Sequence, residues 1–198
     1  MLNLSKSLTL AALLATALPA LAQETAAPAD LSMGAVAGEP AAPRTKETAQ
    51  VDEGYLAANF ELWEQRCIKT ADDKDPCELF QLLKDGEGNN VAEFSIFTLP
   101  EGSQAVAGAT IVVPLETLLT ANLQIAIDTA KPKLYPFTFC AAAGCVARVG
   151  FTADEVAGFK NGAKATITVV PAGAPEEKVN LDLSLKGFTA GYEAIAPK

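Results

Sequence analysis

Four cysteines and the complete absence of histidine define the chemistry open to this chain. Without an imidazole the chain lacks the commonest general base and metal ligand, and Ser/His/Asp or Cys/His nucleophiles are excluded. A thioredoxin-like redox site needs Cys-x-x-Cys at the start of a helix, whereas Cys140 and Cys145 enclose four residues with no helix signal after them. Cys67 and Cys77 are spaced too widely for a four-cysteine zinc site. Structural disulfides are therefore favoured, and no cofactor or metal is expected.

The spacing of the cysteines favours local bridges. Cys140 and Cys145 enclose Ala-Ala-Ala-Gly, whose glycine can turn the chain. Cys67 and Cys77 enclose a segment that ends in the turn residues Asp-Asp-Lys-Asp-Pro, at 72–76. Pairing Cys67 with Cys77 and Cys140 with Cys145 is the simplest of the three possible connectivities. Each bridge would fix the shape of one loop.

The acidic loop between the first two cysteines invites a calcium interpretation. A calcium loop needs oxygen ligands at set positions, a central glycine and a closing glutamate. Asp72, Asp73 and Asp75 could supply oxygens, but Cys77 and Lys84 stand where a ligand and the glutamate should be. The pattern favours an exposed acidic turn.

Two single residues have both a functional and a structural interpretation. Trp63 shares a strand face with Cys67, which favours a core residue near a disulfide over a ligand platform. Arg148 follows the second cysteine pair and could contact an anionic partner, but a solvated or locally paired charge is favoured. Acidic residues are abundant, so carboxylate pairs for glycoside chemistry cannot be located without distances.

The chain that must position these residues begins with an export signal. Residues 1–22 combine Lys6 in a short polar start, an apolar run at 8–18, a proline, and the small residues of Ala-Leu-Ala before the expected cleavage site. The apolar run is too short to span a bilayer, which takes roughly 20 residues, so no membrane span is expected. The expected location is the periplasm, with secretion or outer-membrane association as alternatives. Such a compartment is oxidising and agrees with disulfides.

Removal of residues 1–22 would leave 176 residues with a net charge of −10, because the 24 acidic residues all remain and one of the 15 basic residues is lost. This balance argues against nucleic acid and anionic lipid surfaces, which demand clustered Lys and Arg. It agrees with simple solubility. The length suits one domain with a sizeable core.

The mature chain divides into two parts. Residues 23–53 are rich in Ala, Pro, Glu and Thr without an apolar period, which predicts a disordered spacer. Residues 54–198 are predicted to form a single domain of short strands separated by turns. The predicted strands cover residues 60–68, 77–84, 91–99, 110–113, 123–128, 134–139, 146–149, 165–170 and 179–185.

One helix and one strand have the clearest local signals. Thr152 with Glu155 is a capping box and a later Asn-Gly is a stop, which predicts a short helix at 153–160. Residues 179–185 alternate apolar and polar side chains, which predicts a strand with one buried and one wet face. The fold class is therefore mainly β, as an antiparallel β-sandwich or barrel with one short helix.

Several motifs across residues 55–195 together resemble one known family. They are Phe60-x-x-Trp63-x-x-x-Cys67, Cys77-Glu78-Leu79-x-Gln81, Val113-Pro114-Leu115 leading to Ile125-x-Ile127-Asp128, Phe137-x-x-Cys140-Ala-Ala-Ala-Gly144-Cys145-Val146-Ala147, and Leu183-x-Leu185-Lys186-Gly187-Phe188. The chain is similar to the invasion-associated locus B family. It departs from the family at Glu116, where glycine is frequent. The resemblance implies an immunoglobulin-like β-sandwich in the bacterial envelope and supplies no catalytic residues.

The expected function is a non-enzymatic envelope or periplasmic interaction protein, whose partner is an envelope or host protein. Binding would use sheet edges or end loops, with the two cysteine loops as natural candidates because disulfides preorganise them. The alternatives are a carboxylate-dependent hydrolase acting on envelope polysaccharide and a thiol-handling or chaperone-like periplasmic protein. A chaperone-like role would require an open sheet edge that accepts a strand.

Overall fold

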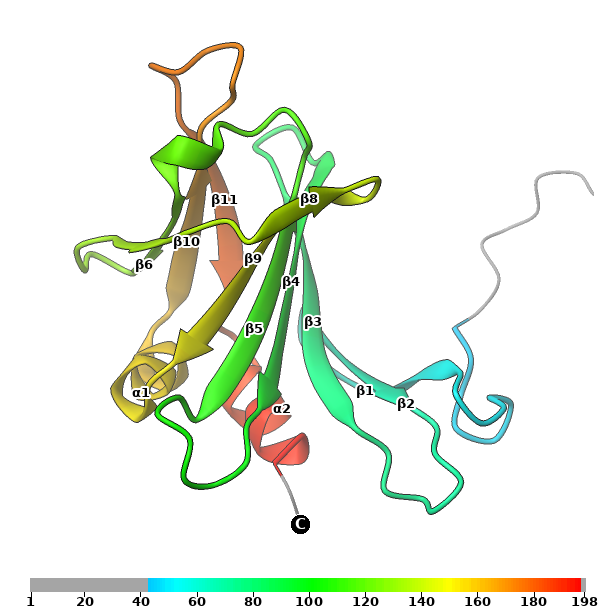
Figure 1. Ribbon diagram of the computed structural model, residues 1–198. Coiled ribbons are helices and arrows are strands. Elements are labelled where there is room, and N and C mark those ends of the chain that lie inside the picture. Colours follow the sequence, from blue (N-terminus) through cyan, green and yellow to red (C-terminus); the bar gives the residue numbers. More distant parts are fainter. Residues whose placement is uncertain (1–42, 197–198) are drawn as a thin grey trace, which may run out of the picture. The chain divides into compact units, whose positions relative to one another are not determined.

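The computed structural model describes residues 43–196, which form two antiparallel sheets and few short helices (Figure 1). The larger sheet has the order β1-β2-β3-β4-β5-β9-β8 and the smaller one β11-β10-β6-β7. The larger sheet contains β1 (Gly54–Phe60), β2 (Trp63–Ile68), β3 (Cys77–Lys84), β4 (Asn90–Thr98), β5 (Ala107–Val113), β8 (Phe139–Ala141) and β9 (Gly144–Phe151). The smaller sheet contains β6 (Leu123–Ile127), β7 (Lys133–Tyr135), β10 (Lys164–Val169) and β11 (Val179–Ser184). The predicted mainly β fold is confirmed.

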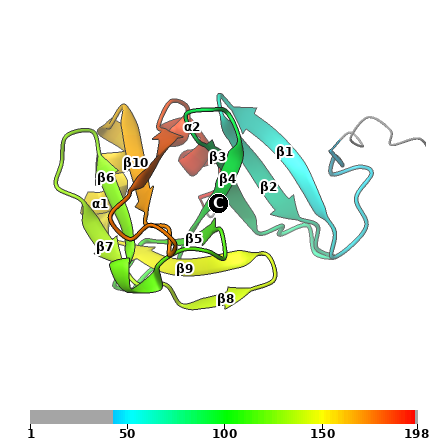
Figure 2. The ribbon, with the colours of Figure 1, turned by 90° about the horizontal axis from the view of Figure 1, so that it is seen from above.

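The two sheets share one hydrophobic core. Alternate residues of each strand point inward, as the period of two requires. The largest fully buried side chains include Trp63, Phe94, Phe151, Phe159 and Phe188. Their rings contact one another, with the Trp63 ring centre 5.9 Å from that of Phe94 and 5.3 Å from that of Phe188. Figure 2 shows β6, β7 and β10 on one side of the molecule and the β1–β2 hairpin on the other.

Two α-helices, α1 (Ala153–Asn161) and α2 (Phe188–Ala194), accompany the sheets, together with a 3-10 turn at Leu119–Ala121. The predicted helix at 153–160 is α1, which Thr152 caps by the predicted box. The sequence did not predict α2, which adds a second helix to the expected one. It starts after Gly187, whose backbone has φ +80° and no capping side chain.

Two predicted strands are interrupted, one by a turn and the other by a proline, which lacks a backbone N–H donor. The predicted strand at 60–68 is interrupted at Glu61 and Leu62, which form the turn of the hairpin between β1 and β2. The predicted strand at 134–139 is split into the ends of β7 and β8. Pro136 lies between them, and proline cannot donate to a ladder.

The folded part begins before the predicted domain boundary at residue 54. Residues 43–53 form a turn that packs on the β1–β2 hairpin, and Ala49 is 4% exposed. The Lys69 side chain donates hydrogen bonds of 2.9 and 2.8 Å to the carbonyl oxygens of Lys46 and Ala49. Residues 43–53 therefore belong to the folded domain and not to the predicted spacer. Long-range hydrogen bonds hold this segment, although its sequence has no apolar period. Its remainder, 23–42, and the predicted signal peptide lie outside the described residues.

Within residues 43–196, no helix has both the length and the apolar composition needed to cross a membrane.

Candidate functional site

The four cysteines form two disulfides, Cys67–Cys77 and Cys140–Cys145, as predicted. Each bridge joins residues that stand directly opposite each other on neighbouring strands, β2 with β3 and β8 with β9. No free cysteine is left in the chain that the structure describes. Both bridges therefore tie the ends of strand pairs together, and each holds a loop that could contact a partner.

The acidic loop next to the first bridge is held by protein donors. The Asp75 carboxylate accepts hydrogen bonds from the Tyr55 hydroxyl at 2.7 Å and the Thr70 backbone N–H at 2.8 Å, and pairs with the Lys46 ammonium at 3.0 Å. These contacts, led by the Tyr55 hydroxyl, hold the pKa of Asp75 well below its usual range. Burial and the same hydrogen bond raise the pKa of Tyr55 to about 12. The carboxylate thus acts as an anchor between the loop and residues 43–53.

The acidic loop does not provide a set of ligands for calcium. Lys46 also pairs with Asp73 at 3.2 Å, so an ammonium occupies the space between the two aspartates. Across residues 43–196, no group of three or more acidic or cysteine side chains is arranged to hold a metal ion.

Trp63 is a core residue, as predicted, and not a ligand platform. Its side chain has no exposed surface, and its indole N–H donates to the Ser184 carbonyl oxygen at 2.8 Å. Cys67 belongs instead to a small separate cluster with Ala49 and Tyr55. The expected packing of Trp63 near the disulfide is therefore replaced by packing between the two sheets.

The side of the seven-stranded sheet that faces away from the core carries a row of side chains that are apolar on four of the five strands it crosses. The register places Leu82, Glu93, Val112, Val146 and Phe139 opposite one another across β3, β4, β5, β9 and β8. Phe139 is 43% and Leu82 37% exposed. Neighbouring rows on the same side contain Phe80 and Phe97. We call this surface the outer sheet face; its apolar members are Phe80, Leu82, Phe97, Val112, Phe139 and Val146.

A shallow hollow of about 430 Å³ lies within the outer sheet face, where two opposed glycines replace side chains. Gly108 and Gly150 form its floor, and Phe97 and Arg148 line it. The Phe97 ring covers Gly108 so closely that a Cβ there would come within 2.6 Å of the ring. The glycines therefore create space for Phe97 and a depression beside it.

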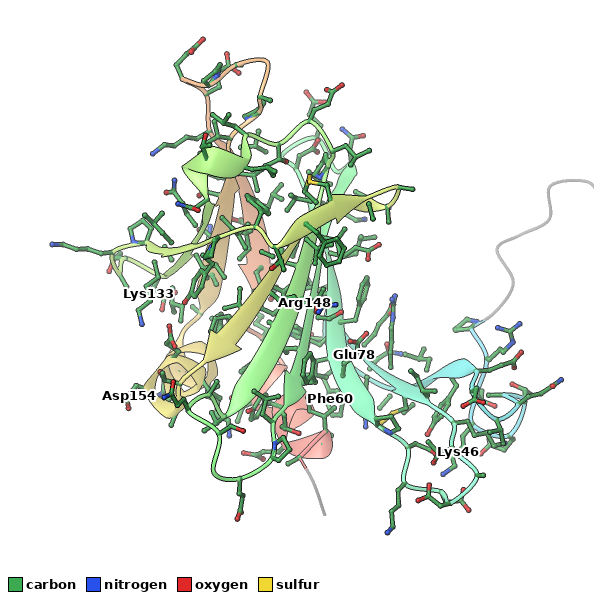
Figure 3. All side chains as sticks on the ribbon, in the orientation of Figure 1. Lys46, Phe60, Glu78, Lys133, Arg148 and Asp154 are labelled. Atoms are coloured by element: carbon green, nitrogen blue, oxygen red, sulfur yellow. A yellow bond between two sulfur atoms is a disulfide. The ribbon has the colours of Figure 1, made fainter. Side chains whose placement is uncertain are left out.

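Charged side chains lie among the apolar ones on this face, including Glu64, Arg66, Glu78, Glu93 and Arg148, and aromatic rings contact the two arginines. The Arg148 guanidinium carbon lies 5.5 Å from the centre of the Phe139 ring, and that of Arg66 lies 3.3 Å from the centre of the Phe80 ring. Burial raises the pKa of Glu78, although Ser95 and Arg66 act in the opposite direction. Figure 3 shows Glu78 and Arg148 on strands of this sheet.

The residue types on the outer sheet face can form a contact surface. Aromatic residues and arginine are enriched at protein interfaces. The nearby Cys140–Cys145 bridge fixes the β8–β9 hairpin that presents Phe139. Two features singled out in the sequence, Arg148 and the Cys140–Cys145 bridge, lie close together at the outer sheet face. Two others do not belong to it: Trp63 lies in the core, and the Cys67–Cys77 bridge lies next to residues 43–53.

Several residues of this surface were not predicted. Phe97, Gly108 and Phe139 carry no local signal, because their shared face depends on the strand order of the sheet. Phe139 directly precedes Cys140 in the sequence, but this adjacency does not indicate that its ring lies on the exposed side of the sheet.

Comparison with known proteins gives consistent matches. The model of the invasion associated locus B (IalB) protein family matches residues 63–196. Invasion protein B homologs of Brucella abortus (strain 2308) and Brucella abortus biovar 1 (strain 9-941) are each 41% identical over 68 residues, which cover 34% of this chain and 38% of each relative. The matched part therefore spans little more than a third of those relatives.

A solved structure shares the fold. The crystal structure of invasion associated protein B from Bartonella henselae aligns with a TM-score of 0.60 over 71% of this chain and 94% of that chain, at 21% identity. The family model covers more than half of the residues, from β2 to the end of α2. The chain thus belongs to the invasion associated locus B protein family.

Proposed function

We propose that this protein is an exported, non-enzymatic component of the bacterial envelope that binds another protein through the outer sheet face. The observation that carries the proposal is the row of apolar side chains Leu82, Val112, Val146 and Phe139 on β3, β5, β9 and β8, which Glu93 of β4 interrupts and which ends at the exposed Phe139 beside a disulfide-fixed hairpin. A surface with this composition gains free energy when a partner removes it from water.

Export is supported by two independent features. Residues 1–22 have the pattern of a cleavable signal peptide. The two disulfides are typical of proteins that fold in an oxidising compartment. Together they favour the periplasm as the location.

A non-enzymatic role is supported by the state of the candidate groups. The sequence has no histidine, and all four cysteines are engaged in disulfides. A groove between β3 and β11 is lined by three carboxylates, those of Glu64, Asp85 and Asp182. Glu64 pairs with Arg66 at 2.7 Å and Asp182 with Lys164 at 2.9 Å, so these two carboxylates already have cationic partners, and Asp85 accepts hydrogen bonds from Asn89.

The partner that fits the outer sheet face is a protein surface with apolar side chains and a carboxylate. The apolar side chains would cover Phe139, Val112 and Leu82. A carboxylate would match Arg148, for which no ion pair occurs within the described residues and which is held beside Phe139. Burial of a charge-assisted contact at the centre of an apolar patch is how many interfaces gain specificity.

The experiment is crosslinking followed by recovery of partners from envelope extract, with two matched variants. Phe139→Ser removes the exposed ring of the outer sheet face. Leu134→Ser removes a similarly exposed side chain, 59% accessible, from β7 of the other sheet. We expect the same partner with the wild-type protein and with Leu134→Ser, and a loss of about tenfold or more with Phe139→Ser.

Two results would contradict the proposal. One is that the wild-type protein recovers no partner even after crosslinking. The other is that Phe139→Ser and Leu134→Ser recover the partner equally well. Cell fractionation tests the location separately, since a mature protein found only in the cytoplasm would exclude export.

A further inference from the structure

One edge of the strand β11 pairs with no other strand. Some backbone groups on this edge are hydrogen-bonded to side chains, and others are not. The strand β11 is the first strand of the four-stranded sheet and pairs with β10 on one side only. On the other side, the Ser184 backbone N–H donates to Gln81 Oε1 at 2.8 Å. The Ser184 carbonyl oxygen accepts from Gln81 Nε2 at 3.1 Å and from Trp63 Nε1 at 2.8 Å. The Gln81 amide thus takes the place of one residue of a neighbouring strand.

The alternation of an antiparallel ladder places two more residues on this free side. Leu185 donates its N–H in the other direction, to the Ala163 carbonyl oxygen beyond the end of β10. The register from Ser184 back to Asn180 is continuous, so Asp182 and Asn180 face the same way as Ser184. No side chain of residues 43–196 is hydrogen-bonded to the backbone N–H or C=O of Asp182 or Asn180.

The opposite wall also has an unpaired backbone edge. The strand β2 pairs with β3 only as far as the register Glu64–Phe80, because the chain then turns at Leu62. The Ile68 N–H donates to the Pro76 carbonyl oxygen, which fixes the even-numbered residues of β2 as those that face β3. By the same alternation, the backbone of Leu82 points to the side where β2 has ended.

These two edges line one groove of about 550 Å³. The Gln81–Ser184 contact closes one end. Leu62 and Leu82, 66% and 37% exposed, supply apolar surface. The charged residues that line the groove are Glu64, Asp85, Asp182 and Lys84. Arg66 and Lys164 pair with Glu64 and Asp182, so the groove itself is close to neutral, and the attraction for a basic segment comes from the net charge of −9 of the whole chain.

We propose that this groove binds an extended segment of another polypeptide, which adds to β11 as a further strand. The segment would continue the ladder that Gln81 begins at Ser184, with its own N–H and C=O groups bonded to those of Asp182 and Asn180. Strand addition of this kind gains affinity from the main chain, and specificity from alternate side chains. Here the apolar side chains would contact Leu62 and Leu82, and the others would be basic because the chain as a whole has a net charge of −9.

The probe is a fluorescein-labelled peptide of alternating valine and lysine, about seven residues long, which is the length of an ordinary strand. Fluorescence anisotropy with the full mature protein measures its binding. A second peptide has the same side chains but N-methylated backbone amides, and a third has glutamate in place of lysine. We expect saturable binding of the first peptide. The N-methylated peptide should bind about 30-fold more weakly, since two lost hydrogen bonds of about 1 kcal/mol each correspond to that change. The glutamate peptide should bind about tenfold more weakly, because its charge has the same sign as the net charge of the protein.

A pair of protein variants separates backbone from side chain. Asp182→Pro removes the free N–H of the edge, and proline is tolerated on an edge strand where the N–H faces outward. Asp182→Ala removes the same carboxylate and its ion pair with Lys164 but keeps the N–H. We expect Asp182→Pro to weaken binding about tenfold and Asp182→Ala to weaken it about threefold or less. If Asp182→Pro does not fold, binding of the N-methylated peptide to the wild-type protein still tests whether backbone hydrogen bonds hold the peptide.

Three results would overturn the inference. The N-methylated peptide binds as tightly as its parent, which would indicate charge attraction alone. A folded Asp182→Pro protein binds the parent peptide like the wild type. The wild-type protein forms a dimer in sedimentation that Asp182→Pro abolishes, which would make a second copy the occupant. Phe139→Ser should leave peptide binding unchanged, so failure here and failure of the outer sheet face are distinguishable.

Discussion

The side-chain amide of Gln81 in β3 joins the backbone of Ser184 in β11 through two hydrogen bonds of 2.8 and 3.1 Å, across 103 residues of sequence. Gln81 is 3% exposed, and the Trp63 indole shares the same carbonyl oxygen. The contact links the two sheets at one point and satisfies an edge that would otherwise be buried without partners. It also defines where the open part of the β11 edge begins.

Replacement of Gln81 by leucine should destabilise the protein by about 2 kcal/mol. The volume is nearly kept, but the Ser184 N–H loses its acceptor in a buried place, and unpaired buried donors cost about 1–3 kcal/mol. Urea unfolding followed by tryptophan fluorescence measures the effect. The control Gln104→Leu changes an exposed glutamine in the loop between β4 and β5 and should stay within about 0.5 kcal/mol. Equal midpoints for the two variants would contradict the role assigned to Gln81.

Glu155 should make stability depend on pH in the acidic range. Its carboxylate accepts hydrogen bonds of 2.8 Å from Lys133, Tyr135 and the Thr152 backbone N–H. Burial alone would raise the pKa of Glu155, but these contacts outweigh it and lower the pKa to about 2. Because the folded pKa lies below the unfolded one, the stabilisation is present above about pH 5 and is lost as the pH falls toward 2.

The variant Glu155→Gln removes the contribution of Glu155 to this dependence and leaves that of Asp75. We expect it to lower the free energy of unfolding at pH 7 by about 2–3 kcal/mol and to flatten the change between pH 5 and 2. Denaturant titrations at several pH values provide the test. Glu193→Gln is the control, since Glu193 is exposed and its pair with Lys160 is 3.6 Å long. A wild-type protein that is as stable at pH 2.5 as at pH 6 would refute the assignment.

Local chemistry made part of this fold predictable. The Thr152–Glu155 capping box predicts α1, and both hydrogen bonds of the box are present. The alternation at residues 179–185 predicts β11 with Leu181 and Leu183 inside, and both are fully buried. The short cysteine spacings predict both bridges. These features are set by residues within about ten positions of one another, so a single sequence contains the information.

The parts that were not predictable depend on residues far apart in the chain. The free edge of β11 follows from strand order and not from the composition of residues 179–184. The residue before α2, Gly187, has no room for a side chain because a Cβ there would lie 2.5 Å from the Phe60 carbonyl oxygen, a contact across the fold. Residues 43–53 are held by Lys69 and Asp75, which no local pattern of that segment indicates.

Gly144 should not tolerate a side chain. Its φ is +144°, and a Cβ would lie 2.4 Å from the Val113 carbonyl oxygen on β5. Since backbone must shift to make room, Gly144→Ala should cost about 2 kcal/mol or more. Gly173→Ala is the matched control, because nothing lies within 4 Å of a Cβ there. Thermal unfolding compares the two, and an equal melting temperature for both variants would be inconsistent with the close approach of β9 to β5.

The two disulfides should contribute unequally to stability. On the chain-entropy model, the ten-residue separation of Cys67 and Cys77 gives about 3 kcal/mol and the five-residue separation of Cys140 and Cys145 about 2 kcal/mol. Cys67 also packs against Ala49 and Tyr55, so its loss should loosen residues 43–53. Double alanine variants of each pair, compared by urea unfolding and limited proteolysis, test both points. We expect early cleavage in residues 43–53 only when the Cys67–Cys77 pair is removed. Equal protection of that segment in both variants would show that Lys69 and Asp75 hold it without the bridge.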